Sequence, residues 1–260
     1  MSGASELLAE GIGESYKFYE KLDAIVCGKA VMVARPTGGS SQVESLTGPT
    51  NSTVVVRLNN DRRPCDIFAT TFFEGIDVSV PTGTKLIVDT VPNAEIECWD
   101  PSQDAGVTVR DWRPEHNRYH GGLPRATVTP EHWRLLSLSM PIFPLSGLVL
   151  LSMLAMTRME RCDISGFNFY TDMSRREFYD KVGHRFTPVR PCFLMHDYVA
   201  SIQWLERLIA VDRRFHWHET RSLEEIRLET ERRIAWVTIR QPIAKLNRRA
   251  RNMMSGWLAS

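Results

Sequence analysis

The sequence predicts one α/β domain built on a Rossmann-like, mostly parallel sheet flanked by helices. Two observations carry this prediction. Short runs of apolar and β-branched residues end in Gly, Asn, Asp or Thr, and segments with helical spacing or loop composition separate them. This alternation is typical of a parallel sheet with helices on its faces. A chain of 260 residues with 43% hydrophobic residues can bury the core of one such domain.

The first half of the chain is expected to form one helix and four strands. Residues 4–23 place apolar side chains at helical spacing. Four runs then have the composition of strands buried on both faces, namely 29–34, 53–58, 66–70 and 85–89. Residues 99–129 contain Pro and Gly breaks and are expected to be a long irregular loop, of the kind that often forms a lid.

The second half is expected to begin with a helix at 131–138 and then the unit 143–170. In that unit Ser146 is the expected N-cap of a helix over 147–158, and a short buried strand over 162–167 follows. The remaining expected elements are a helix at 198–210, a strand at 214–217 and a helix at 222–239 opened by the capping box Ser222-Leu223-Glu224-Glu225.

These elements divide the chain into an N-terminal helix at 1–24, a Rossmann-like domain at 25–220 and a helical extension at 221–260. Residues 243–257 of the extension place apolar side chains on one helical face and Lys and Arg on the other. Such a helix fits the anionic surface of a membrane. The alternative is that it packs on the domain or on a neighbouring subunit of a homo-oligomer.

Composition excludes several classes of function and location. A formal net charge of +1 argues against nucleic acid as a partner, because binding many phosphates needs an excess of Lys and Arg. The five cysteines form no CxxC pair, so neither a disulfide framework nor a zinc ribbon is indicated. The N-terminus lacks the pattern of a signal peptide, and the longest apolar run is too short to span a bilayer. We expect a soluble or peripherally attached cytoplasmic protein, lying at the inner face of the membrane in the second case.

Polar side chains follow three of the expected strands or apolar runs. Asn59 ends one of them, Asn168 and Tyr170 end another, and His196 ends a third. The carboxyl ends of parallel strands share one edge, where ligands of α/β proteins bind. The helix that begins at Ser146 and Gly147 would add backbone N–H groups that attract an anion. Each polar residue alone is more often a cap or a core hydrogen-bond partner, but their joint position predicts a binding site.

The same segments resemble the conserved motifs of sialyltransferases. VVVRLNN followed by RRPCDIFATTF is similar to their first motif, the L motif. FPLSGLVLLSMLAMTRMERCDISGFNFY resembles the S motif, and LMHDYVASIQWLERL looks like the third motif, in which a His opens an amphipathic helix. Together the three segments lie in the family's order and cover roughly residues 29–210.

The resemblance implies a variant GT-A type glycosyltransferase that acts by inversion and needs no metal. It would move sialic acid, or a related sugar such as Kdo, from a CMP-sugar to a glycan hydroxyl. His196 is then the expected general base, and Tyr170 and Tyr179 are the expected donors to the departing phosphate. The expected contacts to the nucleotide or the donor sugar are Arg35, Thr37, Asn59, Ser146, Gly147 and Asn168.

Two departures from the family pattern leave an alternative open. The first strand runs into Arg35-Pro36-Thr37 where the family has an Asn that contacts the nucleotide, and Asn168 stands where bacterial members have Asp. Arg35 could replace the missing Asn as a phosphate ligand. Alternatively, the chain is a non-catalytic relative that binds nucleotide or glycan in surface-polysaccharide assembly.

Other functions are less favoured by the sequence. No GxGxxG follows the first strand, which disfavours a dinucleotide-dependent oxidoreductase. The absence of Asp-x-Asp is consistent with chemistry that needs no metal. His116 with His120, and His216 with His218, have spacings compatible with metal binding, but the first pair lacks a third ligand in sequence.

Overall fold

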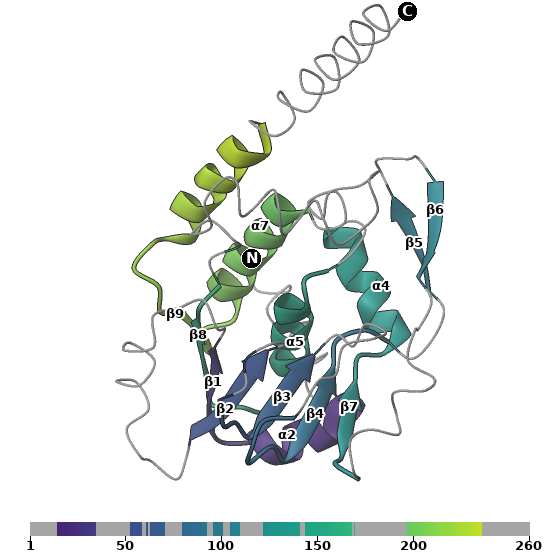
Figure 1. Cartoon of the computed structure of the whole chain (residues 1–260), viewed down its shortest axis with the longest axis vertical. Helices are drawn as coiled ribbons and strands as arrows, with labels where there is room; N and C mark the ends of the chain where they lie inside the picture. Colours follow the sequence, from purple (N-terminus) through teal and green to yellow (C-terminus); the bar gives the residue numbers. More distant parts are fainter. Residues whose placement is uncertain are drawn as a thin grey trace, which may run out of the picture.

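Figure 1 shows the computed structural model of the chain. It describes residues 15–34, 53–58, 61, 63–70, 80–92, 96–100, 105–109, 122–140, 144–167, 169 and 197–235. Of these, residues 15–16, 96–100 and 105–109 are described by their backbone alone. The predicted membrane or subunit contact at 243–257 lies outside these residues. Within the described ranges, no helix is both long enough and apolar enough to cross a bilayer.

The centre of the molecule is a seven-stranded sheet in which every neighbouring pair is parallel. In spatial order the strands are β7 (Arg125–Thr127), β4 (Leu86–Asp89), β3 (Ile67–Thr70), β2 (Thr53–Leu58), β1 (Ala30–Ala34), β8 (Arg161–Ser165) and β9 (Phe215–Trp217). Every strand expected from the sequence is present. The prediction of a Rossmann-like α/β fold is therefore confirmed.

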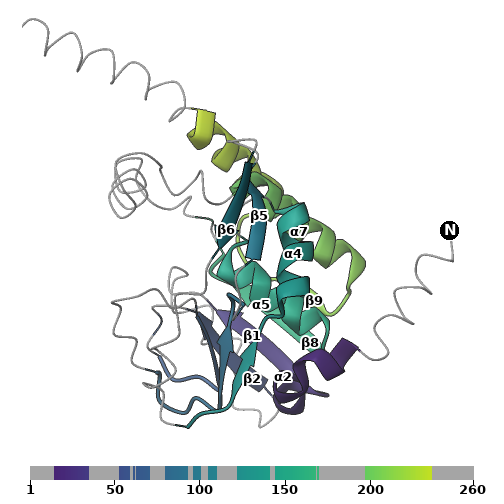
Figure 2. The same cartoon turned by 90° about the vertical axis from the view of Figure 1, so that its right-hand side faces the viewer.

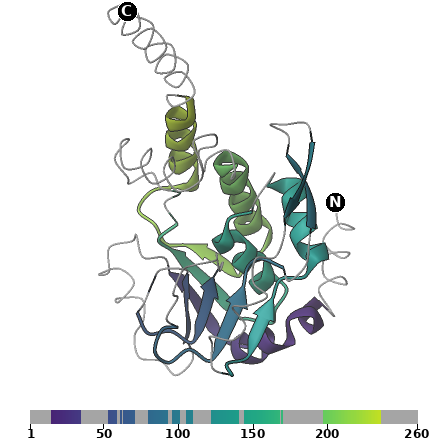
Figure 3. The ribbon, with the colours of Figure 1, turned by 45° about the vertical axis from the view of Figure 1, so that its right-hand side comes forward.

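Helices precede and connect these strands. They are η1 (Ser15–Tyr19), α2 (Glu20–Val26), α4 (Pro130–Ser139), α5 (Ser146–Ala155) and α7 (Tyr198–Val211), followed by a helix at 223–235. Figure 2 shows α2 and α5 on the same side of the sheet. Figure 3 shows the 223–235 helix beside α7, to which the Arg227–Glu206 ion pair joins it at 3.7 Å.

The core lies between the sheet and these helices. Alternate residues of β1 divide between its two faces, so that Val31 and Val33 join the main core while Met32 and Ala34 lie on the opposite face. Both pairs are buried, as expected for a central strand of a parallel sheet. From the helical layer, Leu150 of α5 and Ile202 of α7 are fully buried in the main core.

The structure corrects two predictions about secondary structure. Part of the expected irregular loop at 99–129 is ordered, because β5 (Ile96–Asp100) and β6 (Ala105–Val109) form an antiparallel pair and β7 joins the main sheet. Pro and Gly separate these short strands rather than excluding them. Within the described part of the expected helix at 4–23, residues 15–19 form a 3-10 helix, and α2 begins at Glu20.

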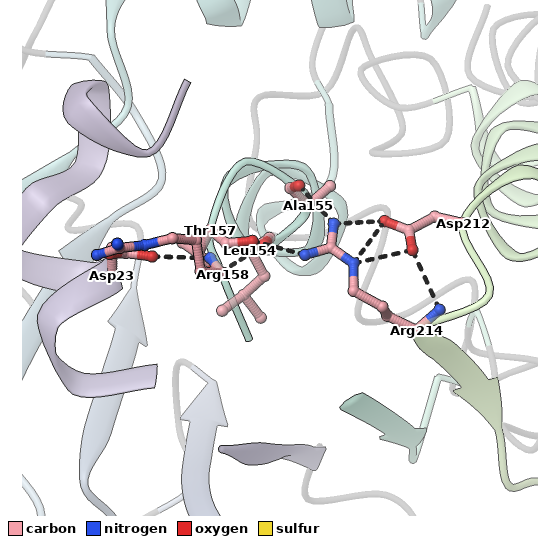
Figure 4. Close-up of polar contacts among 7 residues, drawn as sticks. All are labelled: Asp23, Leu154, Ala155, Thr157, Arg158, Asp212 and Arg214. Carbon is pink, nitrogen blue, oxygen red and sulfur yellow. Dashed lines mark hydrogen bonds and ion pairs between the residues drawn. The ribbon is translucent and has the colours of Figure 1, made fainter. Parts of the chain in front are cut away.

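Arg158 and Asp23 tie α2 to the amino-terminal edge of the sheet. Asp23 is 3% exposed in its side chain and accepts three hydrogen bonds from Arg158. They come from the backbone N–H at 2.7 Å, from Nε at 3.0 Å and from Nη2 at 2.5 Å (Figure 4). One carboxylate therefore fixes both the backbone and the side chain of the residue that leads into β8.

Arg214 makes a second connection at the same edge. Its Nη1 donates to the Thr157 carbonyl at 2.5 Å and its Nη2 to the Ala155 carbonyl at 2.7 Å (Figure 4). Asp212 accepts from Nε and Nη2 of the same guanidinium. The carbonyls at the end of a helix lack partners within the helix, so Arg214 caps α5 and also neutralises its negative end.

Candidate functional site

The chain changes direction in the sheet at β1. It runs outward from β1 through β2, β3 and β4 to β7, and then returns to β8 on the other side of β1. The strand order therefore reverses between β1 and β8, and open α/β sheets bind their ligands outside the carboxyl ends of the strands at such a point. Register places Ala34 beside Arg57 of β2 and beside Ser165 of β8, so three strands end at one level.

The N-terminus of α5 also lies at this edge, and it begins one residue earlier than predicted. Leu145 is the N-cap and makes no side-chain capping bond, whereas Ser146 is already helical. The Leu145 carbonyl accepts from the amides of Leu148 and Val149 at 2.8 and 3.0 Å. The extended backbone of Leu145 after Pro144 decides where the helix starts, so the prediction of Ser146 as N-cap is wrong.

An aromatic ring packs so closely against Gly147 that it leaves no room for a side chain. A Cβ atom at this position would lie 2.4 Å from Cε1 and 2.8 Å from Cζ of Phe167. Phe167 follows β8 by two residues and is 3% exposed. The close approach at Gly147 is thus the packing of Phe167, which locks the N-terminus of α5 onto the tip of β8. Anion binding by Ser146 and Gly147 stays a prediction.

A glutamate also holds the tip of β8 in place. The Ser165 hydroxyl donates to Oε1 of Glu219 at 3.2 Å, and the Gly166 N–H donates to the same oxygen. Gly166 has φ +78°, a conformation that favours glycine, and Phe169 has φ +47°. The backbone therefore turns at Gly166, directly after β8. The predicted site residue Asn168 lies outside the described residues.

A buried cluster of charge stands at the end of β2. Asp61 is 3% exposed and accepts from Arg63 three times, from its backbone N–H at 3.1 Å, from Nε at 3.0 Å and from Nη2 at 2.7 Å. Arg57, whose side chain is 10% exposed, approaches Asp61 with Nη1 at 3.4 Å. Two guanidinium groups therefore share one carboxylate, and Arg63 makes the closer contacts to it.

The pKa directions agree with this arrangement. Burial, together with the nearby charge of Arg63, lowers the pKa of Arg57, although Asp61 opposes the shift. Burial alone would raise the pKa of Asp61, but the hydrogen bonds from Arg63 and the charge of Arg57 outweigh it and lower that pKa. Asp61 is therefore ionised and held mainly by Arg63.

At the end of β4, on the same edge of the sheet, a buried carboxylate is fully paired. Asp89 at the end of β4 is buried and accepts from Arg125 twice, from Nε at 3.1 Å and from Nη2 at 2.9 Å. It also accepts from the Thr127 hydroxyl at 3.1 Å. Here one guanidinium makes a bidentate pair with one carboxylate, the geometry expected of a structural ion pair.

Beside β9, His218 contacts Asp163 through Nε2 at 2.5 Å, and Arg161 donates to the same carboxylate oxygen at 2.8 Å. The His216 and His218 ring centroids are 6.5 Å apart. Among the residues whose side chains are placed, no three His, Cys, Asp or Glu gather as metal ligands would. The expectation of chemistry without a metal stays a prediction.

Ser146 and Gly147 are the predicted site residues that the described part of the chain contains. The others lie outside the described residues, namely Arg35, Thr37, Asn59, Asn168, Tyr170, Tyr179 and His196. Their neighbours along the chain are placed, however. Strands β1, β2 and β8 end together, and the N-terminus of α5 contacts the tip of β8.

Sequence reasoning missed Arg57, Asp61 and Glu219. Arg57 had a usable signal, because it is the one charged residue in the run Thr53–Leu58, which is otherwise typical of a buried strand. Asp61 is three residues beyond that strand and had a weaker signal. Glu219 gave none, since it reaches the tip of β8 from a distant segment of the chain.

The fold and this edge define the chain as a Rossmann-like α/β protein with a topological switch point between β1 and β8. No protein-family model matches the chain, and neither the curated proteins nor the solved structures contain a significant match.

Proposed function

We propose that the protein is a sialyltransferase-like glycosyltransferase. It transfers sialic acid, or a related sugar such as Kdo, from a CMP-sugar to a glycan hydroxyl with inversion and without a metal. The observation that carries the proposal is that two motif-like segments, far apart in the sequence, meet at one edge. The L-like segment supplies β2 and β3, and the S-like segment supplies α5 and β8.

The proposed chemistry needs a base, leaving-group donors and an anion site. His196 is the proposed base, and it directly precedes Asp197, whose side chain caps α7 by accepting from the Ala200 amide at 2.8 Å. Tyr170 and Tyr179 are the proposed donors to the departing phosphate. CMP carries a single phosphate, so its departure calls for less charge neutralisation than that of a nucleoside diphosphate, which supports chemistry without a metal.

The proposed contacts to the donor come from several segments of the chain. Ser146 and Gly147 at the start of α5 would bind its phosphate or its carboxylate. Arg35, Thr37, Asn59 and Asn168, which follow strands that end at the same edge, would complete the contacts. Arg35 would act in place of the missing Asn.

Thermal unfolding with ligand tests the nucleotide site. CMP should raise the melting temperature, because a ligand that binds only the folded state stabilises it. Cytidine and AMP are the matched controls, and smaller shifts are expected from both. No shift with CMP, CDP or a CMP-sugar would remove the transferase from consideration.

Turnover tests the chemistry. His196→Ala should abolish release of CMP from a CMP-sugar and leave the CMP-induced shift in place. His216→Ala is the control histidine, and we expect it to retain activity. Unchanged turnover in His196→Ala would exclude His196 as the base.

A second candidate is a non-catalytic relative that binds nucleotide or glycan in surface-polysaccharide assembly. The presence of Asn168 where bacterial family members have a carboxylate favours it. This candidate predicts that CMP binds to the wild-type protein but that no CMP is released from any CMP-sugar. Release of CMP that depends on His196 would exclude it.

A further inference from the structure

We propose that Arg57 binds an anionic oxygen group of the ligand, a phosphate or a carboxylate, at the carboxyl end of β2. Arg57 lies opposite Ala34, the last residue of β1, and Ala34 lies opposite Ser165 of β8. Neighbouring strands are about 4.8 Å apart, so Arg57 is one strand away from the switch point and level with it. The identity of the ligand as a CMP-sugar rests on the proposed function.

Arg57 has donors to spare. Within the described residues, its Nε and Nη1 are buried and form no hydrogen bond. The carboxylate of Asp61 is 3.4 Å from Nη1 and already accepts three hydrogen bonds from Arg63. The residue is 9% exposed, so the guanidinium is covered but not sealed from solvent.

A buried cation without hydrogen bonds is costly, and proteins rarely keep one without a use for it. The planar guanidinium fork matches the paired oxygens of a phosphate or a carboxylate. An oxyanion at this edge would accept from the Nε and Nη1 donors of Arg57, which form no hydrogen bond within the described residues. The two anionic groups of a CMP-sugar, the phosphate of CMP and the carboxylate of the sugar, share this chemistry.

Stability separates this role from a purely structural one. If Arg57 served only the fold, Arg57→Met would destabilise the protein, because a needed contact would be lost. If it serves a ligand, Arg57→Met should leave the melting temperature of the free protein unchanged or raise it, since Arg63 continues to pair Asp61. Arg125→Met is the matched control, because Arg125 pairs the buried Asp89 and its loss should lower the melting temperature.

Ligand affinities then identify the group that Arg57 binds. The probes are CMP, cytidine and free sialic acid, measured by calorimetry on the full chain for wild type, Arg57→Met, Arg57→Lys and Arg125→Met. If Arg57 binds the phosphate, Arg57→Met should lose the preference for CMP over cytidine by about tenfold or more, as expected of charge-assisted hydrogen bonds. If it binds the carboxylate, sialic acid should weaken by a similar factor and CMP should not. Arg57→Lys should fall between wild type and Arg57→Met.

Equal affinities of wild type and Arg57→Met for CMP and for sialic acid would overturn the proposal and leave the proposed function standing. Failure of the wild type to bind any of these probes would instead overturn the proposed function.

Inorganic phosphate then tests Arg57 alone, at constant ionic strength. A larger phosphate-induced rise in melting temperature in the wild type than in Arg57→Met supports the anion site, and equal rises overturn it. If Arg57→Met does not fold, the same comparison is made with Arg57→Lys.

Discussion

The arginines at the amino edge of the parallel sheet differ from Arg57 at its carboxyl edge in how completely their donors are used. At the amino edge, Arg158 and Arg214 donate to carboxylates and to backbone carbonyls, and they join α2, α5 and β9 to the start of β8. At the carboxyl edge, Arg57 is buried beside an aspartate that Arg63 already holds, and two of its nitrogen atoms have no acceptor within the described chain. The first edge is built for stability, and the second retains unused donors.

This difference follows from the geometry of a parallel sheet. Side chains at the amino edge can be fixed by the connections that enter the strands, while ligands bind where the strands end. Stability and binding therefore depend on different residues of the same molecule. Substitutions at the amino edge should lower stability with little effect on ligand affinity, and substitution of Arg57 at the carboxyl edge should do the reverse.

The largest effect is expected for Asp23→Ala at the amino edge. Removing one partner of a buried ion pair costs about 3 to 5 kcal/mol. The side chain of Arg158 is 57% exposed and can regain water, which reduces the cost, but its backbone N–H loses its acceptor. We expect a loss of about 2 to 3 kcal/mol in the free energy of unfolding, measured by urea denaturation.

Ligand affinity is the control for that substitution. The Kd of any ligand that stabilises the wild type should stay within about twofold in folded Asp23→Ala, because the amino edge takes no part in binding. Asp23→Asn keeps an oxygen for the Arg158 amide and should cost less. A large change in Kd with little change in stability would contradict the view that the amino edge serves stability and not binding.

A second effect depends on pH and concerns the far end of the carboxyl edge, where α4 begins after β7. Tyr19 accepts from the Thr129 amide at 3.4 Å, so its hydroxyl proton is available to Nδ1 of His132, 2.5 Å away. Burial lowers the pKa of His132 to about 4 and raises that of Tyr19 to about 12. The folded protein therefore keeps His132 neutral.

The sign of the pH effect follows from that shift. The unfolded chain binds a proton at His132 near pH 6.5, whereas the folded chain does so only near pH 4. The contribution of His132 is thus fully present above pH 6.5 and is lost as the pH falls toward 4. We expect a loss of about 1 to 2 kcal/mol between pH 7 and pH 4.5 from this residue.

His132→Asn should remove this step, because Asn keeps an oxygen to accept from Tyr19 but does not titrate. Unfolding free energies measured by urea at each pH give the comparison. Tyr19→Phe is the control, and it should lower stability by about 1 kcal/mol while leaving the step in place. An unchanged acid step in His132→Asn would assign the acid sensitivity to other groups, such as Asp61, whose pKa is lowered.

The sheet could be predicted from the sequence because its strands are local patterns. A run such as Thr53–Leu58 is β-branched and apolar, and this composition suffices to identify a strand buried on both faces. Strand order was less accessible, since the return from β7 to β8 depends on packing between distant segments. The β5 and β6 pair was missed because two short strands between Pro and Gly resemble a loop.

The sequence predicted the location of the candidate site but not the side-chain contacts within it. The α5 and β8 unit was predicted from the run between Phe143 and Tyr170. The need for glycine at position 147 was not predicted, because it arises from a tertiary contact with the ring of Phe167. Glu219 could not have been found, since the hydrogen bond from Gly166 joins segments 53 residues apart. Patterns within a short segment can therefore be recognised in the sequence, whereas contacts between distant segments cannot.

A smaller effect on stability is expected for Gly147→Ala at the carboxyl edge. The added methyl group would displace the Phe167 ring, and overpacking of this kind typically costs about 1 to 3 kcal/mol. Alanine recovers about 0.5 to 1 kcal/mol through its helix propensity. The net loss should be about 1 kcal/mol, measured by urea denaturation.

The effect of Gly147→Ala on binding should be larger than its effect on stability. Moving Phe167 shifts the segment that contains Asn168, so the CMP-induced rise in melting temperature should be reduced or lost. The double variant Gly147→Ala with Phe167→Leu should be less unstable than the sum of the two single variants, because the smaller side chain admits the methyl group. Strict additivity would mean that the ring and Gly147 do not interact.

The smallest effect has the opposite sign and concerns Ser201 in α7, the helix that starts toward the carboxyl edge. The Ser201 hydroxyl is fully buried and has no hydrogen-bond partner in the described chain. The Ser152 hydroxyl of α5, by contrast, donates to the Val149 carbonyl at 2.7 Å. Ser201→Ala should therefore raise the free energy of unfolding by about 0.5 kcal/mol, whereas Ser152→Ala should lower it. If Ser201→Ala gains stability but loses CMP affinity, the unused hydroxyl belongs to the binding edge together with Arg57. If it loses stability, the idea that unsatisfied groups mark the carboxyl edge fails at this residue.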